Sequence, residues 1–244
     1  MKPLEFEKRN RKFVAGMGQD LKLKKITQKW FEAVSKHEYS YHFKWMGRPI
    51  IQFPTDIIAF QEIVWDVQPD LIIETGIARG GSLIFYASML QLLRNNAKVL
   101  GIDIDIREHN RADIERHPMF KRISMLEGSS VDPEIISKVY KFAEGKKRIL
   151  VVLDSLHTHD HVLGELKAYS PLVKKGSYVA VLDTIIGHMP KKFSSNRPWG
   201  PDDNPATAVK EFLKSNSRFV VDKEIDNKLL ISVAPGGYLK CVKN

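Results

Sequence analysis

Residues 70–82 read Asp-Leu-Ile-Ile-Glu-Thr-Gly-Ile-Ala-Arg-Gly-Gly-Ser, a short apolar run followed by a turn with three glycines. The apolar residues of the run are continuous rather than alternating, which is typical of a strand covered on both faces in a parallel sheet. A helical pattern of apolar residues then extends over residues 80–94. This stretch predicts a buried strand, a glycine turn and a crossover helix, the basic unit of an α/β fold.

The same unit recurs along the chain. Further apolar runs begin at four positions, Val99, Ile123, Ile149 and Tyr178. Counted from Leu71, successive runs are 28, 24, 26 and 29 residues apart, which is the length of one strand plus one crossover helix. Helical patterns over residues 132–144 and 160–173 lie between the later runs. We therefore predict a doubly wound sheet with five parallel strands.

After residue 183 the pattern changes. A loop rich in Gly, Pro, Ser and Asn (187–205) leads into a predicted helix over residues 205–214. Two predicted strands, Arg218–Val221 and Leu229–Val233, follow it, and only a short polar turn separates them. No crossover helix fits between strands so close together, so they must pair antiparallel or through a neighbour. The sheet is thus expected to be mostly parallel, with an antiparallel C-terminal edge.

The N-terminal part precedes the sheet and is basic. Residues 1–30 hold nine basic and three acidic side chains, in a chain with 38 Lys and Arg, 29 Asp and Glu and a net charge of +9. Helices are expected over residues 21–38 and 57–67, the second with Thr55 as its N-cap. We divide the chain into a basic arm with a helix (1–40) and an α/β domain (41–244). The arm is expected to be solvated, and it is a candidate contact surface of a homo-oligomer.

Composition excludes several classes of protein. The 244 residues are 43% hydrophobic and 27% charged, as in an ordinary globular protein rather than a disordered tail or a fibre. The single cysteine, Cys241, cannot form an internal disulfide, and no apolar run reaches the roughly 18 residues of a membrane span. The N-terminus lacks the apolar stretch of a secretory signal, and the basic arm has no zinc-finger spacing or RNA-binding aromatic signature. We expect a soluble cytoplasmic protein that does not bind nucleic acid.

Acidic residues close four of the five predicted strands: Glu74, Asp103, Asp154 and Asp183. A single acid at such a position commonly caps the next helix. Four of them at the carboxyl edge, where open α/β sheets bind ligands, indicate a binding site. The turn after the first strand has the spacing G-x-x-x-G-G, which differs from the dinucleotide fingerprint G-x-G-x-x-G. Asp103 follows Gly76 by 27 residues and can accept both hydroxyl hydrogens of a ribose, so a nucleoside cofactor is predicted.

Several separated motifs resemble known proteins. The pattern E-x-G-x-x-x-G-x-S of residues 74–82, the acid that closes the second strand, and Gly128-Ser-Ser-x-Asp132 are similar to the Rossmann-like fold of S-adenosylmethionine-dependent methyltransferases. Three further segments resemble the cephalosporin hydroxylase family, which includes O-methyltransferases acting on sugar hydroxyls of antibiotics and glycolipids. These segments are Trp45-Met-Gly-Arg-Pro49 with Gln52, Pro54 and Asp56, then Leu153-Asp-Ser-Leu-His-Thr-His-Asp-His-Val162, and finally Pro235-Gly-Gly-Tyr-Leu239. The resemblance extends from about residue 40 to the C-terminus.

The resemblance implies a set of residues that bind S-adenosylmethionine. The glycine turn would surround the methionine end of the cofactor, whose carboxylate the Ser82 hydroxyl would receive. Asp103 would hold the ribose hydroxyls, and Ser130 and Asp132 would lie near the adenine. The implied cofactor residues are Glu74, Gly76, Gly80, Ser82, Asp103, Ser130 and Asp132.

Catalytic and metal-binding residues are implied in the same way. Asp154 and Asp183 would hold a divalent cation such as Mg²⁺, and Asp154 and His157 would act on the acceptor, with His157 taking the proton from its hydroxyl. The family typically carries Glu-Asp where this chain has Leu182 and Asp183, so one carboxylate ligand is missing. Two alternatives remain open: waters, Thr184 or substrate oxygens complete a Mg²⁺ site, or the metal is lost. The implied reaction is methyl transfer to a hydroxyl of a small molecule or sugar.

The segment from His157 to His161 has a competing interpretation. It approaches the H-x-H-x-D-H pattern of binuclear hydrolases but lacks one residue. If a helix begins near Thr158, His157 and His161 lie one turn apart and both face a ligand; otherwise His159 and His161 are surface or packing residues. A metal-dependent hydroxylase or hydrolase, and a cofactor-binding protein without transfer activity, remain alternatives. The loop over 187–205, with Trp199, is a candidate lid over the acceptor.

Overall fold

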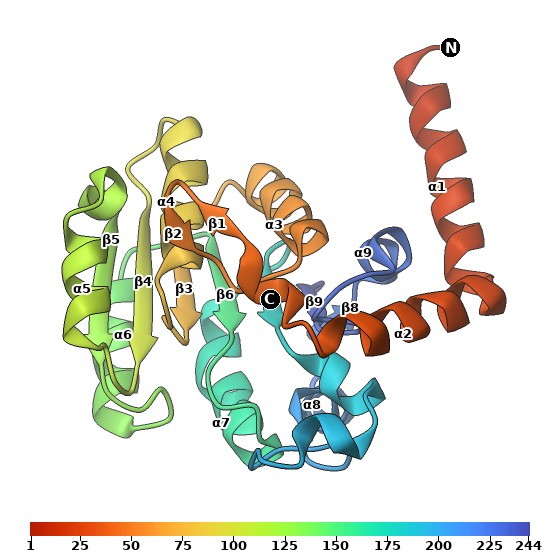
Figure 1. The fold of residues 1–244 in the computed structure, drawn as a ribbon. Coiled ribbons are helices and arrows are strands. Elements are labelled where there is room, and N and C mark those ends of the chain that lie inside the picture. Colours follow the sequence, from red (N-terminus) through yellow and green to blue (C-terminus); the bar gives the residue numbers. More distant parts are fainter.

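The computed structural model describes all residues, 1–244, and its centre is a seven-stranded sheet (Figure 1). The strands follow the order β5 (Ile123–Glu127), β4 (Lys98–Asp103), β3 (Leu71–Thr75), β6 (Ile149–Leu153), β7 (Tyr178–Val181), β9 (Tyr238–Cys241) and β8 (Phe219–Val221). The first five are parallel, whereas β9 runs antiparallel to both β7 and β8. The chain passes outward from β3 to β5 and returns to β6 on the other side of β3, so the order reverses between β3 and β6. The predicted parallel sheet with an antiparallel C-terminal edge is confirmed.

Helices cover both faces of this sheet. One hydrophobic cluster includes residues of five helices, α2 (Leu21–Ser35), α3 (Pro54–Val67), α4 (Gly81–Leu92), α5 (Glu108–Glu115) and α9 (Lys223–Leu229). The cluster on the other face includes residues of α6 (Pro133–Ala143), α7 (His159–Tyr169) and α8 (Pro205–Ser215). Strand β3 shows how the layers form: Ile72 packs in the first cluster, while Leu71 and Ile73 pack in the second, because strand side chains alternate. The continuous apolar runs are therefore strands buried on both sides.

Two helices precede the domain. α1 (Pro3–Gln19) and α2 (Leu21–Ser35) meet at Asp20, whose side chain accepts a hydrogen bond from the N–H of Leu23 and caps α2. α1 buries none of its residues, extends away from the sheet and contacts α9 (Figure 1). A 3-10 helix (Tyr39–His42) and a hairpin of β1 (Lys44–Trp45) and β2 (Arg48–Pro49) lead to α3. Within the basic arm α1 is thus solvated, whereas α2 buries Phe31 against the domain.

The prediction of a strand over Leu229–Val233 is wrong, because a helix, α9, replaces the expected turn and the last strand is β9. Asp222 accepts hydrogen bonds from two N–H groups of the first turn of α9, which is an N-cap that starts a helix. Leu229 and Val233 are buried, but the N–H of Val233 donates to Asp56 of α3 and not to a strand. The apolar run over residues 229–233 therefore indicates buried side chains and not a strand paired in the sheet.

The prediction of Thr55 as an N-cap is also wrong. α3 begins at Pro54 with Phe53 at the N-cap, since proline lacks an N–H where the first helical turn leaves that group unpaired. The Thr55 hydroxyl instead donates to the carbonyl of Ile231 at 2.5 Å. The remaining predicted helices match the structure closely. None of the helices combines the length and apolar composition that crossing a membrane requires.

Candidate active site

A cavity of about 640 Å³ lies at the carboxyl ends of the parallel strands. It extends across the sheet edge from the loops after β4 and β5 to the loops after β6 and β7. No Lys or Arg side chain lines it, although the chain carries a net charge of +9. Six of the predicted site residues line this cavity: Gly76, Asp103, Ser130, Asp154, His157 and Asp183.

The loop of residues 76–80, called here the glycine loop, folds back on Asp103. The N–H groups of Ile77 and Ala78 donate to Oδ2 of Asp103 at 2.7 and 3.2 Å. Gly76 has φ of 86°, and a Cβ there would lie 2.0 Å from the carbonyl oxygen of Asp154, so only glycine fits this contact between the β3 and β6 ends. The predicted ribose ligand Asp103 is therefore held by the loop that follows β3, beside the cavity.

Glu74 and Ser82 pair with each other instead of facing the large cavity. The Ser82 hydroxyl donates to Oε2 of Glu74 at 2.7 Å, and the other carboxyl oxygen of Glu74 is buried without a partner. Burial raises the pKa of Glu74 to about 8, against the hydrogen bond from Ser82, and the charge of Asp103 adds to the rise. Ser82 lines a smaller cavity of about 40 Å³, which shares Gly76 and Asp154 with the large one.

Gly80 and Asp132 lie outside the large cavity. Gly80 has φ of 78°, and a Cβ there would lie 2.4 Å from the Ile114 side chain of α5, so its role is to let the loop pack against that helix. The Asp132 carboxylate accepts hydrogen bonds from the N–H groups of Glu134 and Ile135 at 2.8 and 3.3 Å. It is the N-cap of α6 and positions the loop that carries Ser130.

A buried polar network that was not predicted from the sequence surrounds Ser130. Glu165 is fully buried and accepts hydrogen bonds from the hydroxyls of Ser130 and Ser155 at 2.5 and 2.7 Å. Nε2 of His161 lies 3.0 Å from each of these hydroxyls, and His161 lines the cavity. His161 therefore takes part in a polar network beside the cavity, and a role for it beyond packing stays a prediction. The i, i+4 spacing of His161 and Glu165 on α7 was the signal in the sequence.

Two carboxylates and an imidazole meet at the ends of β6 and β7. Ligand atoms of Asp154, His157 and Asp183 all lie within 4.8 Å of one another, and Nδ1 of His157 lies 3.4 Å from Oδ2 of Asp183. Loss of hydration raises the pKa of Asp154 well above its ordinary value, and the charges of Asp183 and Glu74 raise it further. With no Lys or Arg in the lining, the cluster is suited to bind a cation.

The donor set fits a divalent cation in charge and ligand type, although it provides only two carboxylates. Asp154 and Asp183 offer the oxygen ligands that Mg²⁺ prefers, and this ion usually keeps several waters. Leu182 is 1% exposed, lines the cavity and offers no ligand atom. The Thr184 hydroxyl donates to the carbonyl of Pro235 at 2.8 Å and does not line the cavity.

His159 and Trp199 have different places relative to the cavity. His159 lies outside it, with Nδ1 2.9 Å from the Thr207 hydroxyl and Nε2 3.2 Å from the Glu211 carboxylate, and so connects α7 to α8. The histidine cluster therefore does not converge on one metal pair as in a binuclear hydrolase. Trp199, from the loop before α8, lines the cavity and meets the His157 ring edge-on, with 4.8 Å between ring centroids.

The fold and the site define a Rossmann-like methyltransferase, and comparisons with known proteins agree. The family model "Rhamnosyl O-methyltransferase/CmcI" matches residues 37–242. The rhamnosyl O-methyltransferase of Mycobacterium tuberculosis strain H37Rv is 31% identical over 199 residues, which are 80% of this chain and 76% of that protein. The chain belongs to the rhamnosyl O-methyltransferase/CmcI family, and it is an S-adenosylmethionine-dependent O-methyltransferase of that type.

Solved structures support the same fold. A structure titled "cmcI-D160 Mg-SAM" has a TM-score of 0.57 and 18% identity, covering 83% of this chain and 77% of that one. An O-methyltransferase from Bacillus cereus in complex with SAH has a TM-score of 0.51 and 15% identity, covering 89% and 90% of the two chains. These likenesses confirm the mostly parallel, doubly wound sheet.

Proposed function

We propose that this enzyme transfers the methyl group of S-adenosylmethionine to a hydroxyl of a sugar or small molecule, with His157 as the general base. The observation that carries this proposal is the lining of the cavity: Asp103, Asp154 and Asp183 line it, and no Lys or Arg does. A cavity with this charge favours a cationic ligand, and it does so in a chain that is basic overall. The acceptor class is supported by the name of the mycobacterial relative.

The chain would hold the cofactor along the β3, β4 and β5 ends. Asp103 would accept the ribose hydroxyls, and Ser130 would lie near the adenine, supported by Glu165 and His161. The methionine end would lie near Gly76, where the two cavities share lining residues, with Ser82 and Glu74 behind it and Gly80 shaping the turn. Asp132 would contribute only by capping α6. Bound S-adenosylmethionine supplies a methyl group on a cationic sulfur.

His157 would take the proton of the acceptor hydroxyl. Its Nδ1 faces the Asp183 carboxylate, which favours the tautomer with the proton on Nδ1 and leaves Nε2 as the proton acceptor. Trp199, from the loop before α8, packs edge-on against the His157 ring and restrains its orientation. A neutral imidazole of this kind is a general base suited to pH near 7. The end of the cavity formed by His157, Asp183 and Trp199 is therefore the acceptor end.

Asp154 and Asp183 would hold a divalent cation, with waters and acceptor oxygens completing the ligand shell. A bound Mg²⁺ would lower the pKa of the acceptor hydroxyl and orient it. Without the metal, the raised pKa of Asp154 would favour its protonated form. The two cases differ in one measurable respect, since only the first loses transfer activity in EDTA and regains it with Mg²⁺.

The test combines binding and transfer. Calorimetry with S-adenosylhomocysteine is expected to show one site, and methyl transfer is expected with at least one member of a panel of rhamnosides and other hydroxylated acceptors. Asp154→Asn and His157→Ala are expected to keep S-adenosylhomocysteine binding and to lose transfer. Loss of cofactor affinity in both variants would contradict the roles given to these residues. Binding without transfer across the panel would favour a cofactor-binding protein.

A further inference from the structure

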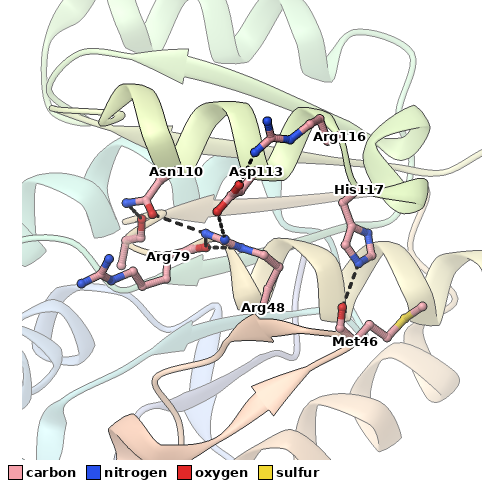
Figure 2. A network of polar contacts seen from close by, with 8 residues as sticks. Met46, Arg48, Arg79, Asn110, Asp113, Arg116 and His117 are labelled. Carbon is pink, nitrogen blue, oxygen red and sulfur yellow. Dashed lines mark hydrogen bonds and ion pairs between the residues drawn. The ribbon is translucent and has the colours of Figure 1, made fainter.

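The glycine loop is covered on its outer side by a side chain from outside the sheet. Arg48 lies in β2 of the N-terminal hairpin (Figure 2). Its side chain is only 13% exposed. The hairpin passes close to the start of α4, where a Cβ on Gly81 would lie 2.1 Å from the carbonyl oxygen of Pro49. A second contact, from Nε2 of His117 to the carbonyl oxygen of Met46 at 3.1 Å, ties the hairpin to the segment after α5.

Arg48 bonds to the glycine loop and to α5 at the same time. Its Nε and Nη2 donate to the carbonyl oxygen of Arg79 at 3.0 and 2.5 Å, and its Nη1 donates to Oδ2 of Asp113 at 2.5 Å. Nη2 also reaches Oδ1 of Asn110 at 3.3 Å, and the Asn110 amide donates to the carbonyl of Ala78 at 3.0 Å. Figure 2 shows these groups converging, while the Arg79 side chain extends away from them.

These contacts hold a loop conformation that the chain would not adopt freely. Ala78 has φ of 45°, a left-handed conformation that disfavours a residue with a Cβ. Side chains from two directions hold it there: Asp103 accepts the N–H of Ile77 and of Ala78, and Arg48 and Asn110 donate to the carbonyls of Arg79 and Ala78. The loop's N–H groups are thereby directed to Asp103, beside the cavity.

We propose that Arg48, with Asn110 and Asp113, is a positioning residue for the cofactor. It touches no lining atom of the large cavity and acts through the glycine loop, whose conformation sets where Gly76 and Asp103 stand. Only arginine offers donors in a planar fork that reaches a carbonyl, an amide oxygen and a carboxylate together. The free enzyme thus carries a preformed cofactor site. Without the Arg48 contact, the glycine loop would have to become ordered when the cofactor binds, and the cofactor affinity would fall.

The experiment compares variants in S-adenosylhomocysteine affinity, hydrogen exchange and catalysis. In Arg48→Ala we expect the dissociation constant and the KM for S-adenosylmethionine to rise about tenfold, as for the loss of bonds to a charged group. The N–H groups of Ile77 and Ala78 are expected to exchange faster in the free protein, while kcat at saturating cofactor and the acceptor KM stay within about threefold. Arg48→Lys, which keeps the charge but not the fork, should show an intermediate rise in both constants.

The chain offers a matched control. Arg116 contacts the same carboxylate, with Nη2 2.6 Å from Oδ1 of Asp113. Its side chain is 75% exposed, and it does not touch the glycine loop. Arg116→Ala removes the same charge and should leave the cofactor affinity within about twofold. If Arg48→Ala does not fold, Asn110→Ala replaces it, since it removes the bonds to the carbonyl of Ala78 and to Nη2 of Arg48 but leaves the Arg48 pair with Asp113.

Four results would overturn the proposal. An unchanged S-adenosylhomocysteine affinity in the folded Arg48→Ala and Asn110→Ala variants would show that the loop needs no such support. An equal loss of S-adenosylhomocysteine affinity in Arg116→Ala would show that the effect comes from removing a positive charge and not from the contact with the glycine loop. A fall of kcat and Tm together with a rise of both KM values in Arg48→Ala would mean that Arg48 supports the fold alone. Absence of S-adenosylhomocysteine binding by the unaltered protein would overturn the cofactor assignment together with this proposal.

Discussion

The two ends of the cavity differ in how their polar groups are satisfied. At the cofactor end, the Asp103 carboxylate accepts the N–H groups of Ile77, Ala78 and Asp105, and the outer carbonyls of the glycine loop bond to side chains of β2 and α5. At the acceptor end, Asp154 and Asp183 lie close together with His157, and no Lys or Arg of the lining neutralises them. The groups around Asp103 are hydrogen-bonded in the free chain, whereas the carboxylates of the acceptor end have no Lys or Arg beside them in the lining.

This difference separates two ways of building a binding site. The cofactor end is preorganised, so that little conformational entropy is lost when a nucleoside binds. At the acceptor end the carboxylates repel one another, and this repulsion contributes to the raised pKa of Asp154. A cation that binds there relieves the repulsion, so its binding is favoured. Substitutions at the first end should therefore change affinity, and substitutions at the second should change the rate and the dependence on pH and metal.

The largest effect is expected at His157. His157→Ala should lower kcat by about 10²- to 10⁴-fold, which is the range for loss of a general base, and should leave S-adenosylhomocysteine affinity within about twofold. His159→Ala is the matched control, because His159 contacts Thr207 and Glu211 outside the cavity. Steady-state kinetics and calorimetry measure both. A kcat for His157→Ala close to that of His159→Ala would contradict the role of His157 as base.

Glu74 provides the next test, through pH. Its pKa is raised from the ordinary value of 4.5 to about 8, so its contribution to stability is present below pH 4.5 and is lost as the pH rises through about 8. Glu74→Gln keeps an acceptor for the Ser82 hydroxyl but cannot ionise. We expect its Tm relative to the wild type to rise by about 10 °C between pH 5 and pH 8, since each pH unit in this window corresponds to about 1.4 kcal/mol and about 1 kcal/mol shifts Tm by about 2–4 °C in a chain of this size. A difference in Tm that is constant over this range would refute the prediction.

Leu182→Glu tests the acceptor end by adding the carboxylate that it lacks. A third carboxylate is expected to bind Mg²⁺ about tenfold more tightly, because ligand charge sets the affinity of such sites. In EDTA the variant should lose Tm relative to the wild type, as a charge replaces a side chain that is 1% exposed, and Mg²⁺ should restore it. Leu182→Gln, of similar shape and without charge, should lose Tm without recovery. Absence of a Mg²⁺-dependent rise in Tm for Leu182→Glu would show that Asp154 and Asp183 hold no metal.

Sequence patterns predict those parts of this molecule that depend on local chemistry or on topology. The buried strands follow from continuous apolar runs, because only a sheet covered on both faces buries every residue of a run such as β3. The meeting of Asp103, Asp154 and Asp183 follows from parallel strands, whose carboxyl ends share one edge. Neither inference needs a side-chain contact.

Several of the features that were missed depend on contacts between distant residues. Val233 gives its N–H to Asp56, 177 residues away in sequence, and this keeps an apolar run out of the sheet. Arg48 donates to Asp113, which is 65 residues away in sequence, and Glu165 accepts from Ser130, which is 35 residues away. No short motif encodes such pairs, since each depends on how two elements are rotated against each other.

Trp199 should give the smallest effect and the finest division between the two ends. Its ring meets that of His157 edge-on at 4.8 Å, and such aromatic pairs contribute about 0.5–1.5 kcal/mol. Trp199→Ala is therefore expected to raise the acceptor KM or lower kcat by about two- to tenfold, with Trp199→Phe close to wild type and S-adenosylhomocysteine affinity unchanged in both. Trp199 lines the cavity beside His157, far along the sheet edge from Asp103. A change in cofactor affinity in Trp199→Ala would therefore show that the two ends are coupled. The division into a preorganised cofactor end and a separate acceptor end would then fail.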